Sequence, residues 1–437
     1  MLKKAFIFFI VRGLASGSNV IGPLLLMGLN QGDLVAPYVA LNTLVMFSGL
    51  LLQGPFQYTI PVESVKRTGF DKFQLSLLVY PIAWSLTFGL VIFILGQIFD
   101  LGLFSKHSVY LSVTLAAFAF SLHLSEIFRA LNKMYFYSVL SGPFVQVLST
   151  LVLLWAYINS RELSVMFLIH GFSLAIYLNL LLALGLCLMA TSRVISFEGS
   201  VWMDLKGAWI IFLVTSMVFC INKSDIWYAS FFLDPIEQKH YTMASRVIMI
   251  ATLFNASFFT VSLTSYVLGA PKVSKESIVD QATELSFITT VFTFVFVACG
   301  AIALVFIGCL FQLGIEYLLG VFVIFSVGQF INAYSGPAGL ILIANKCYSQ
   351  LMTRTLCISI FLVLFIVILR PGDIFTLTLL FVGSQIALNV LMCQAAHNQL
   401  GVRSNFYMRD VRRIVPSLIL RLNCFRDSLC KSRNSGG

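Results

Sequence analysis

Residues 285–311 read LSFITTVFTFVFVACGAIALVFIGCLF, a continuous apolar run without a charged residue. About 20 apolar residues in a helix are enough to cross ~30 Å of hydrocarbon. Phe-rich and Leu-rich runs of similar length recur along the whole chain. Runs this long favour helices, because the strands of a membrane barrel need only about 10 residues each. The sequence therefore predicts an all-α integral membrane protein.

The composition supports lipid as the solvent. Of the 437 residues, 59% are hydrophobic and 11% are charged, whereas soluble chains carry about 25% charged residues. The formal net charge is +10, which on a soluble chain would suggest nucleic acid. Here the basic residues lie in short loops and a tail, so topology explains them and no nucleic-acid partner is expected. None of the nine cysteines forms a C-x-x-C pair, which disfavours both a disulfide framework and a metal site.

We predict about twelve spans, arranged as two six-helix lobes around a central cavity. The predicted lobes are residues 1–200 and 201–400, and residues 401–437 form a basic cytoplasmic tail. The spans are placed at 5–28, 34–54, 75–99, 108–131, 136–159, 164–190, 206–230, 242–268, 285–311, 315–344, 349–369 and 374–396. Asn132-Lys133-Met134-Tyr135 and Asn345-Lys346-Cys347-Tyr348 follow the fourth and tenth spans, an echo that suggests a parallel repeat.

The distribution of lysine and arginine sets the orientation. Most of them fall on the side of the N-terminus, and the predicted outer loops hold only Lys106, Arg161, Lys239 and Arg370. This positive-inside bias places both termini in the cytoplasm. The outer loops are short, and the longest is expected to run from Phe231 to Tyr241. The tail is predicted either to lie on the inner leaflet as an interfacial helix or only to set the topology.

Ionisable residues inside a membrane span usually face a cavity or a partner. Arg12 lies in the first span and shares one helix face with Ser16, Asn19 and Pro23. This face is either the cationic wall of a central path or a place from which Arg12 reaches the inner phosphates.

The seventh span carries Asn222, Lys223 and Asp225, and the eighth carries Arg246. Asp225 and Arg246 lie at similar distances from the hairpin tip at Pro235, so we expect an ion pair between them. Lys223 points away from Asp225 on the same helix and would then be free to contact an anionic ligand.

Other spans carry polar stripes that either bond helices together or line a water-filled lumen. They comprise Asn42, Gly49 and Gln53 in the second span, Thr252, Asn255 and Ser262 in the eighth, and Ser326, Gln329, Asn332 and Gly336 in the tenth. Together with three intramembrane cations, they favour a lumen.

Two further features concern conformational change. His123, Glu126 and Arg129 end the fourth span, where Glu126 and Arg129 form either a local ion pair or a proton-linked gate. Gly-Pro pairs predict kinks or hinges. They occur at Gly22-Pro23, Gly54-Pro55, Gly142-Pro143 and Gly336-Pro337. The sequence contains no Walker loop, no G-x-S-x-G and no metal cluster, so neither an ATPase nor a nucleophile-triad enzyme is expected.

Three segments resemble the polysaccharide flippases of the MOP superfamily, the Wzx or O-antigen transporter type. Asp225-Ile226-Trp227 leads to Tyr241-Thr242-Met243-Ala244-Ser245-Arg246, which is similar to the aspartate, tyrosine, alanine and arginine of that family's seventh and eighth helices. Gly336-Pro337-Ala338-Gly339-Leu340 resembles its tenth-helix ending, and Arg129-Ala130-Leu131-Asn132-Lys133 resembles its first-half counterpart.

The resemblance implies a flippase for undecaprenyl-diphosphate-linked oligosaccharide in the bacterial cytoplasmic (inner) membrane. The two lobes would open alternately, with membrane lipids and other polysaccharide assembly proteins as further partners. Arg12, Lys223 and Arg246 would hold phosphate or acidic sugar, and Asn19, Gln53, Asn222, Asn255, Gln329 and Asn332 would meet hydroxyl groups. No cofactor is expected, and a coupling ion would be a proton or sodium.

Three alternatives remain. A multidrug extruder of the same superfamily would be expected to carry carboxylates in its lobes, whereas the first span carries Arg12 and no acid. A peptidoglycan-precursor flippase would resemble a fourteen-helix plan. A membrane-embedded glycosyl- or acyl-transferase would need a catalytic cluster, and the sequence shows none.

Overall fold

The computed structural model describes residues 2–54, 56, 73–98, 108–191, 195–196, 205–268, 275–407 and 410–416. These residues are helical apart from turns, connections and one pair of two-residue strands. The strands β1 (Phe73–Gln74) and β2 (Ile195–Ser196) pair in parallel. The predicted all-α class is confirmed, because this pair is a local contact between two connections.

The helices follow the predicted spans. In the first half they are α1 (Leu2–Gly28), η1 (Gly32–Leu34), α2 (Val35–Gln53), η2 (Leu75–Leu78), α4 (Val79–Ile98), α6 (Ser108–Ala130), α7 (Met134–Leu140), α8 (Pro143–Ile158) and α9 (Val165–Thr191). In the second half they are α10 (Leu205–Phe232), α11 (Pro235–Leu268), α12 (Lys275–Phe311), α13 (Ile315–Ser335), α14 (Ala338–Ala344), α15 (Tyr348–Leu369) and α16 (Ile374–Leu400).

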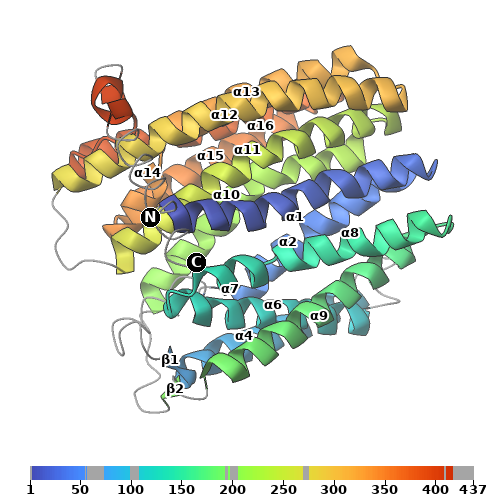
Figure 1. The fold of residues 1–437 in the computed structure, drawn as a ribbon, viewed down its shortest axis with the longest axis horizontal. Coiled ribbons are helices and arrows are strands. Elements are labelled where there is room, and N and C mark those ends of the chain that lie inside the picture. The colour runs from blue at the N-terminus through green and yellow to red at the C-terminus, as the bar shows by residue number, and fades with distance from the viewer. Residues whose placement is uncertain are drawn as a thin grey trace, which may run out of the picture.

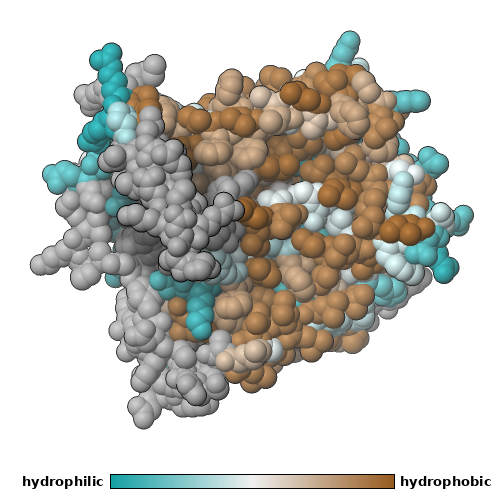
Figure 2. Space-filling view, in the orientation of Figure 1, coloured by the Kyte–Doolittle hydropathy of each residue, from teal (hydrophilic) through white to brown (hydrophobic). Residues whose placement is uncertain are grey.

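The described helices are suited to a bilayer. Nine of them are long and apolar enough to cross it, or ten if α7 and α8 form one broken span. Parts of α1 and α4 add shorter apolar stretches, Gly17–Gly28 and Val79–Val91. Figure 2 shows a broad hydrophobic band across the surface, with hydrophilic side chains towards both ends of the helices. The chain is a multi-pass membrane protein, and the count of twelve crossings stays a prediction.

Four helices form the middle of the molecule. In Figure 1, α1, α2, α10 and α11 lie between the other helices of the first half on one side and those of the second half on the other. Across the halves, α1 packs against α11, and α2 packs against α10 and α11. The central helices therefore bring polar residues of both halves together. The division into lobes at residue 200 and a tail from residue 401 stays a prediction.

Two of the predicted hinges break helices. Gly142 (φ 116°) separates α7 from α8, which bend by 44°, and Gly336 (φ 65°) separates α13 from α14. Glycine adopts these positive φ values without the penalty that a Cβ would bring. Gly54 (φ 60°) instead ends α2, and Gly22-Pro23 lies inside the continuous α1. The predicted spans 136–159 and 315–344 are thus each two helices.

The predicted outer loop from Phe231 to Tyr241 is wrong. α10 runs to Phe232 and α11 begins at Pro235, so the connection is Leu233-Asp234 alone. Asp234 starts α11, because its Oδ1 accepts hydrogen bonds from the backbone N–H groups of Ile236 (2.8 Å) and Glu237 (2.9 Å). A side-chain cap of this kind satisfies donors that the first turn of a helix leaves without partners.

The predicted sequence echo is out of register by one residue. After α6 the left-handed residue is Asn132 (φ 56°), whereas after α14 it is Lys346 (φ 58°). Lys133 N–H bonds the carbonyl of Phe128, and Cys347 N–H bonds that of Leu342, so Cys347 is the geometric counterpart of Lys133. The two turns share a backbone shape, not a residue-for-residue match.

The start of the tail packs on protein. Ser404 Oγ donates to the carbonyl of Ser335 (2.7 Å), and the Phe406 ring meets the rings of Phe287 and Tyr334. Residues 410–416 form a short helix, at the same end of the molecule as the start of α1 (Figure 1). The interfacial position predicted for the tail is untested, and residues 417–437 lie outside the described residues.

Asp373 caps α16, since its Oδ1 accepts from the N–H groups of Phe375 (3.0 Å) and Thr376 (2.8 Å). Hydrogen bonds from Thr376 lower the pKa of this carboxyl.

The substitution Asp373→Ala is expected to lower the free energy of unfolding by about 1 kcal/mol, whereas Asp373→Asn keeps an acceptor and should cost less. Because the pKa of the Asp373 carboxyl is lower in the folded than in the unfolded protein, the carboxylate stabilises the folded protein above about pH 4. This contribution is lost as the pH falls. Melting curves in detergent at pH 7 and pH 3 check this, and an unchanged difference between wild type and Asp373→Ala would contradict it.

Candidate functional site

A central cavity of about 220 Å³ lies where the two halves meet. Its lining comes from α2, the α7–α8 break, α10 and α11. The polar residues that line it are Asn42, Thr43, Ser141, Gln146, Lys223 and Arg246. Two of these side chains are cationic, and none of the described residues in the lining is acidic. The cavity is therefore suited to an anion.

Arg246 holds α11 against α2. Its Nη2 donates to Thr43 Oγ1 (3.3 Å) and, at 3.5 Å, to the carbonyl of Val39, while Nη1 lies 3.6 Å from Met249 Sδ. The residue is only 3% exposed, and its Nε has no partner among the described residues. These acceptors are neutral, so the positive charge of Arg246 is not cancelled by its contacts.

The predicted ion pair between Asp225 and Arg246 is wrong. Asp225 instead accepts a 2.6 Å hydrogen bond from the hydroxyl of Tyr241, and its Oδ1 has no partner in the described part of the chain. Tyr241 and Arg246 are five residues apart on α11, which turns them about 140° from each other around the helix axis. The residue that reaches Asp225 is thus Tyr241, and Arg246 faces α2.

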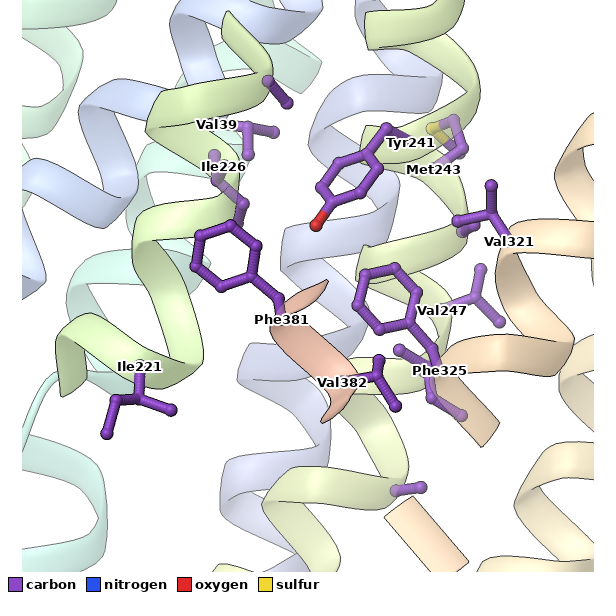
Figure 3. Packing of buried hydrophobic residues seen from close by; sticks show 14 of the residues in the cluster. Val39, Ile221, Ile226, Tyr241, Met243, Val247, Val321, Phe325, Phe381 and Val382 are labelled. Carbon is purple, nitrogen blue, oxygen red and sulfur yellow. The ribbon is translucent and has the colours of Figure 1, made fainter. Parts of the chain in front are cut away.

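Apolar packing fixes the ring of Tyr241. Figure 3 shows it among Phe325, Phe381 and Val247, with its oxygen pointing away from α11. The Tyr241 and Phe325 rings meet edge to face, with centroids 5.5 Å apart. The hydroxyl is therefore held at the Asp225 carboxylate by packing as well as by the hydrogen bond.

Tyr241→Phe removes the hydroxyl that donates to Asp225, which is only 4% exposed. Loss of a donor to a buried carboxylate is expected to cost about 1–3 kcal/mol in the free energy of unfolding. The melting temperature of the purified protein in detergent measures this. Tyr317→Phe, which changes a 49% exposed tyrosine, is the control and should melt like wild type. An unchanged melting temperature for Tyr241→Phe would mean that the bond contributes nothing.

Lys223 carries a positive charge without a carboxylate partner at contact distance. Its Nζ lies 3.4 Å from Met249 Sδ, a weak acceptor. Among the described residues no acidic side chain forms an ion pair with Lys223 within 4.0 Å. Lys223, Phe219 and Met249 line both the central cavity and a second one.

The second cavity, of about 370 Å³, lies within the second half between α10, α11, α13 and α16. The carboxamides that line it belong to Asn222, Gln329, Asn332, Gln385 and Asn389. Lys223 and Asp225 are the charged residues among its described lining. The structure thus brings together Asn222, Lys223, Gln329 and Asn332 in one cavity, and their role in binding stays a prediction. Gln385 and Asn389 were missed, although their spacing of four residues on one face of α16 is a usable signal.

Two predicted hydroxyl-binding residues lie elsewhere. Asn19 is 1% exposed, and its Oδ1 accepts from Asn42 Nδ2 (2.5 Å), which joins α1 to α2. Asn255 is also 1% exposed and exchanges two 3.3 Å hydrogen bonds with Thr293, which joins α11 to α12. Neither lines the two cavities, and their role as binding residues stays a prediction. The side chains of Arg12 and Gln53 lie outside the described residues.

The polar residues at the end of the fourth span form a separate buried cluster. Arg129 Nη1 lies 3.2 Å from Glu126 Oε2, and its guanidinium lies 5.5 Å from the centroid of the Tyr137 ring. His123 Nε2 and Ser85 Oγ are 3.1 Å apart. The local ion pair is therefore present, and it lines neither cavity. That the Glu126–Arg129 pair acts as a proton-linked gate stays a prediction.

Comparisons with known proteins show the fold. No family model and no curated protein matches the sequence. The chain is similar in structure to the MATE multidrug transporter DinF-BH, with a TM-score of 0.61 and 14% identity over 91% of this chain and 94% of that one. It is also similar to an outward-facing multidrug resistance MATE family transporter of the MOP superfamily, with a TM-score of 0.59 and 13% identity over 92% of this chain and 95% of that one. A third neighbour is a MOP superfamily transporter from Pyrococcus furiosus, described as having a binding pocket of reverse polarity. Its TM-score is 0.58, with 12% identity over 92% of this chain and 95% of that one. The chain shares the fold of these transporters.

Proposed function

We propose that this protein is a flippase that carries undecaprenyl-diphosphate-linked oligosaccharide from the cytoplasmic to the periplasmic leaflet of the bacterial inner membrane. The observation that carries the proposal is the central cavity with Lys223 and Arg246 and no acidic residue in its described lining. Buried phosphate groups need cations and hydrogen-bond donors, because charge-assisted bonds offset their loss of water. Thr43, Asn42 and Gln146 supply further polar groups.

The transporter fold supports movement of the cargo by alternating access. Figure 1 shows the central helices of both halves side by side, and a site at such an interface is exposed first to one side and then to the other. The breaks at Gly142 and Gly336 are the hinges in this proposal. The isoprenoid tail stays in the bilayer, so the cavity needs to hold only the polar headgroup. Both termini lie in the cytoplasm.

A second candidate is a MATE-like multidrug exporter that carries organic cations, and the neighbours' names, which describe multidrug transporters, favour an exporter. One observation supports it: Asp225 Oδ1 is buried without a partner among the described residues, beside the second cavity. We assign this carboxylate to coupling by a proton or sodium, with the Glu126–Arg129 pair as another candidate. A cationic cargo would have to share its path with Lys223 and Arg246, which favours the flippase.

A deletion strain separates the two candidates. The measurements are surface polysaccharide on gels, lipid-linked oligosaccharide by mass spectrometry of membrane extracts, and growth with cationic drugs. The flippase predicts loss of surface polymer and accumulation of the complete lipid-linked repeat unit. Unchanged polymer without accumulation, together with new drug sensitivity, would establish the exporter instead.

A further inference from the structure

The two cavities are neighbours that share one wall. Phe219 and Lys223, one turn apart on α10, and Met249 on α11 line both of them. The Lys223 ammonium lies at this wall, 3.4 Å from Met249 Sδ. A single ligand can therefore contact Lys223 while parts of it occupy both cavities.

The cavities differ in charge. The described lining of the central cavity carries Arg246 and the shared Lys223 and no acid, which suits an anionic group such as a diphosphate. The second cavity shares Lys223 and adds one acid, Asp225, without an ion pair between them, and five carboxamides line the rest of it. A carboxamide offers both donors and an acceptor, so this lining is suited to a neutral group with many hydroxyl or amide functions. Its volume, about 370 Å³, lies in the usual range of about 300–1,000 Å³ for small-molecule sites.

Part of the hydrogen-bonding capacity in the second cavity is unused. The side chains of Asn222, Gln385 and Asn389 make no hydrogen bond with any residue that the structure describes. In contrast, Asn332 Nδ2 donates to Gln329 Oε1 at 3.4 Å. Gln385 is 9% exposed, so its unused capacity lies inside the protein. Free carboxamides of α10 and α16 thus line one cavity, to which Phe219 and Phe325 add aromatic surface.

We infer that the cargo binds in two parts: the diphosphate in the central cavity, and the sugar attached directly to it in the carboxamide-lined cavity of the second half. Lys223 bridges the two parts at the shared wall. The sugar is neutral and carries hydroxyl or acetamido groups. This inference rests on the proposed function, and it adds that the first sugar is recognised separately, by Gln385 and Asn389 of α16.

Two soluble probes test the inference by calorimetry on the purified protein in detergent. One is farnesyl diphosphate, and the other is farnesyl diphosphate linked to one N-acetylglucosamine. The sugar is expected to tighten binding to wild type about tenfold, which is what one or two added hydrogen bonds supply. The double variant Gln385→Leu/Asn389→Leu should bind bare farnesyl diphosphate like wild type and lose the tenfold gain.

The control changes carboxamides on the same helix outside the cavity. Asn398→Leu and Gln399→Leu alter exposed residues near the end of α16 and should keep the gain. If the double variant fails to fold, the single variant Asn389→Leu, at a half-buried position, is expected to lose part of the gain. Equal binding of the two probes to wild type would overturn the inference and leave the proposed function standing. Binding of neither probe would overturn both.

Discussion

Lys223→Met is expected to reduce transport by about 10- to 100-fold. The substitution keeps an apolar stem of similar length against Met249 but removes the charge from the wall that the two cavities share. A hydrogen bond to a charged group contributes about 1.5–3 kcal/mol, and each 1.4 kcal/mol corresponds to a factor of ten. The rate at which surface polymer reappears in a complemented deletion strain, at equal amounts of membrane protein, measures this.

Two matched variants interpret the result. Lys223→Arg keeps the charge and should retain a large part of the activity. Lys239→Met removes a cation at the predicted outer end, where Lys239 pairs with Asp33 at 3.3 Å, and should transport like wild type. A fully active Lys223→Met variant, with wild-type protein levels, would show that the charge of Lys223 does not hold the cargo.

Gly336→Ala is expected to lower the melting temperature by about 2–12 °C. Gly336 has φ 65° and ψ −160°, a region that essentially only glycine adopts, and a non-glycine residue there costs about 1–3 kcal/mol. A Cβ would also lie 2.5 Å from the carbonyl oxygen of Ser404, so the start of the tail must move away. A loss of 1 kcal/mol shifts the melting temperature of a large domain by roughly 2–4 °C.

Gly339→Ala is the matched control, because it changes a glycine three residues further along, inside α14. A Cβ there meets no atom within 4 Å, and alanine favours a helix. It should melt at or slightly above the wild-type temperature. If both variants melt like wild type, the backbone at Gly336 is not the constraint that separates α13 from α14.

The helices could be predicted because lipid imposes a simple rule. Apolar runs such as residues 285–311 have no alternative to a helix in the bilayer, so their existence and order can be seen in the sequence. The residues at which the helices begin and end follow less directly from the apolar runs. α11 begins at Pro235 rather than residue 242, since the cap at Asp234 lets polar residues continue the helix outside the apolar run.

The site was predictable in part. Polar residues in the seventh and tenth spans, Asn222, Lys223, Gln329 and Asn332, do line a cavity, although their role in binding stays a prediction. The partner of Asp225 was not predictable, because similar depth does not determine which face of α11 turns towards α10. Asn19 and Asn255 show the same limit, since an amide that bonds two helices and an amide that lines a cavity have the same sequence signal.

The most direct test of the central claim is flipping by the purified protein in vesicles. A fluorescent, short-chain prenyl diphosphate linked to N-acetylglucosamine is placed in both leaflets, and a reductant that cannot cross the membrane is added outside. The account predicts that the protein exposes the inner-leaflet label to the reductant and that Lys223→Met slows this. If the inner label stays as protected as in protein-free vesicles, while the same vesicles move a cationic dye along a proton or sodium gradient, the account is contradicted.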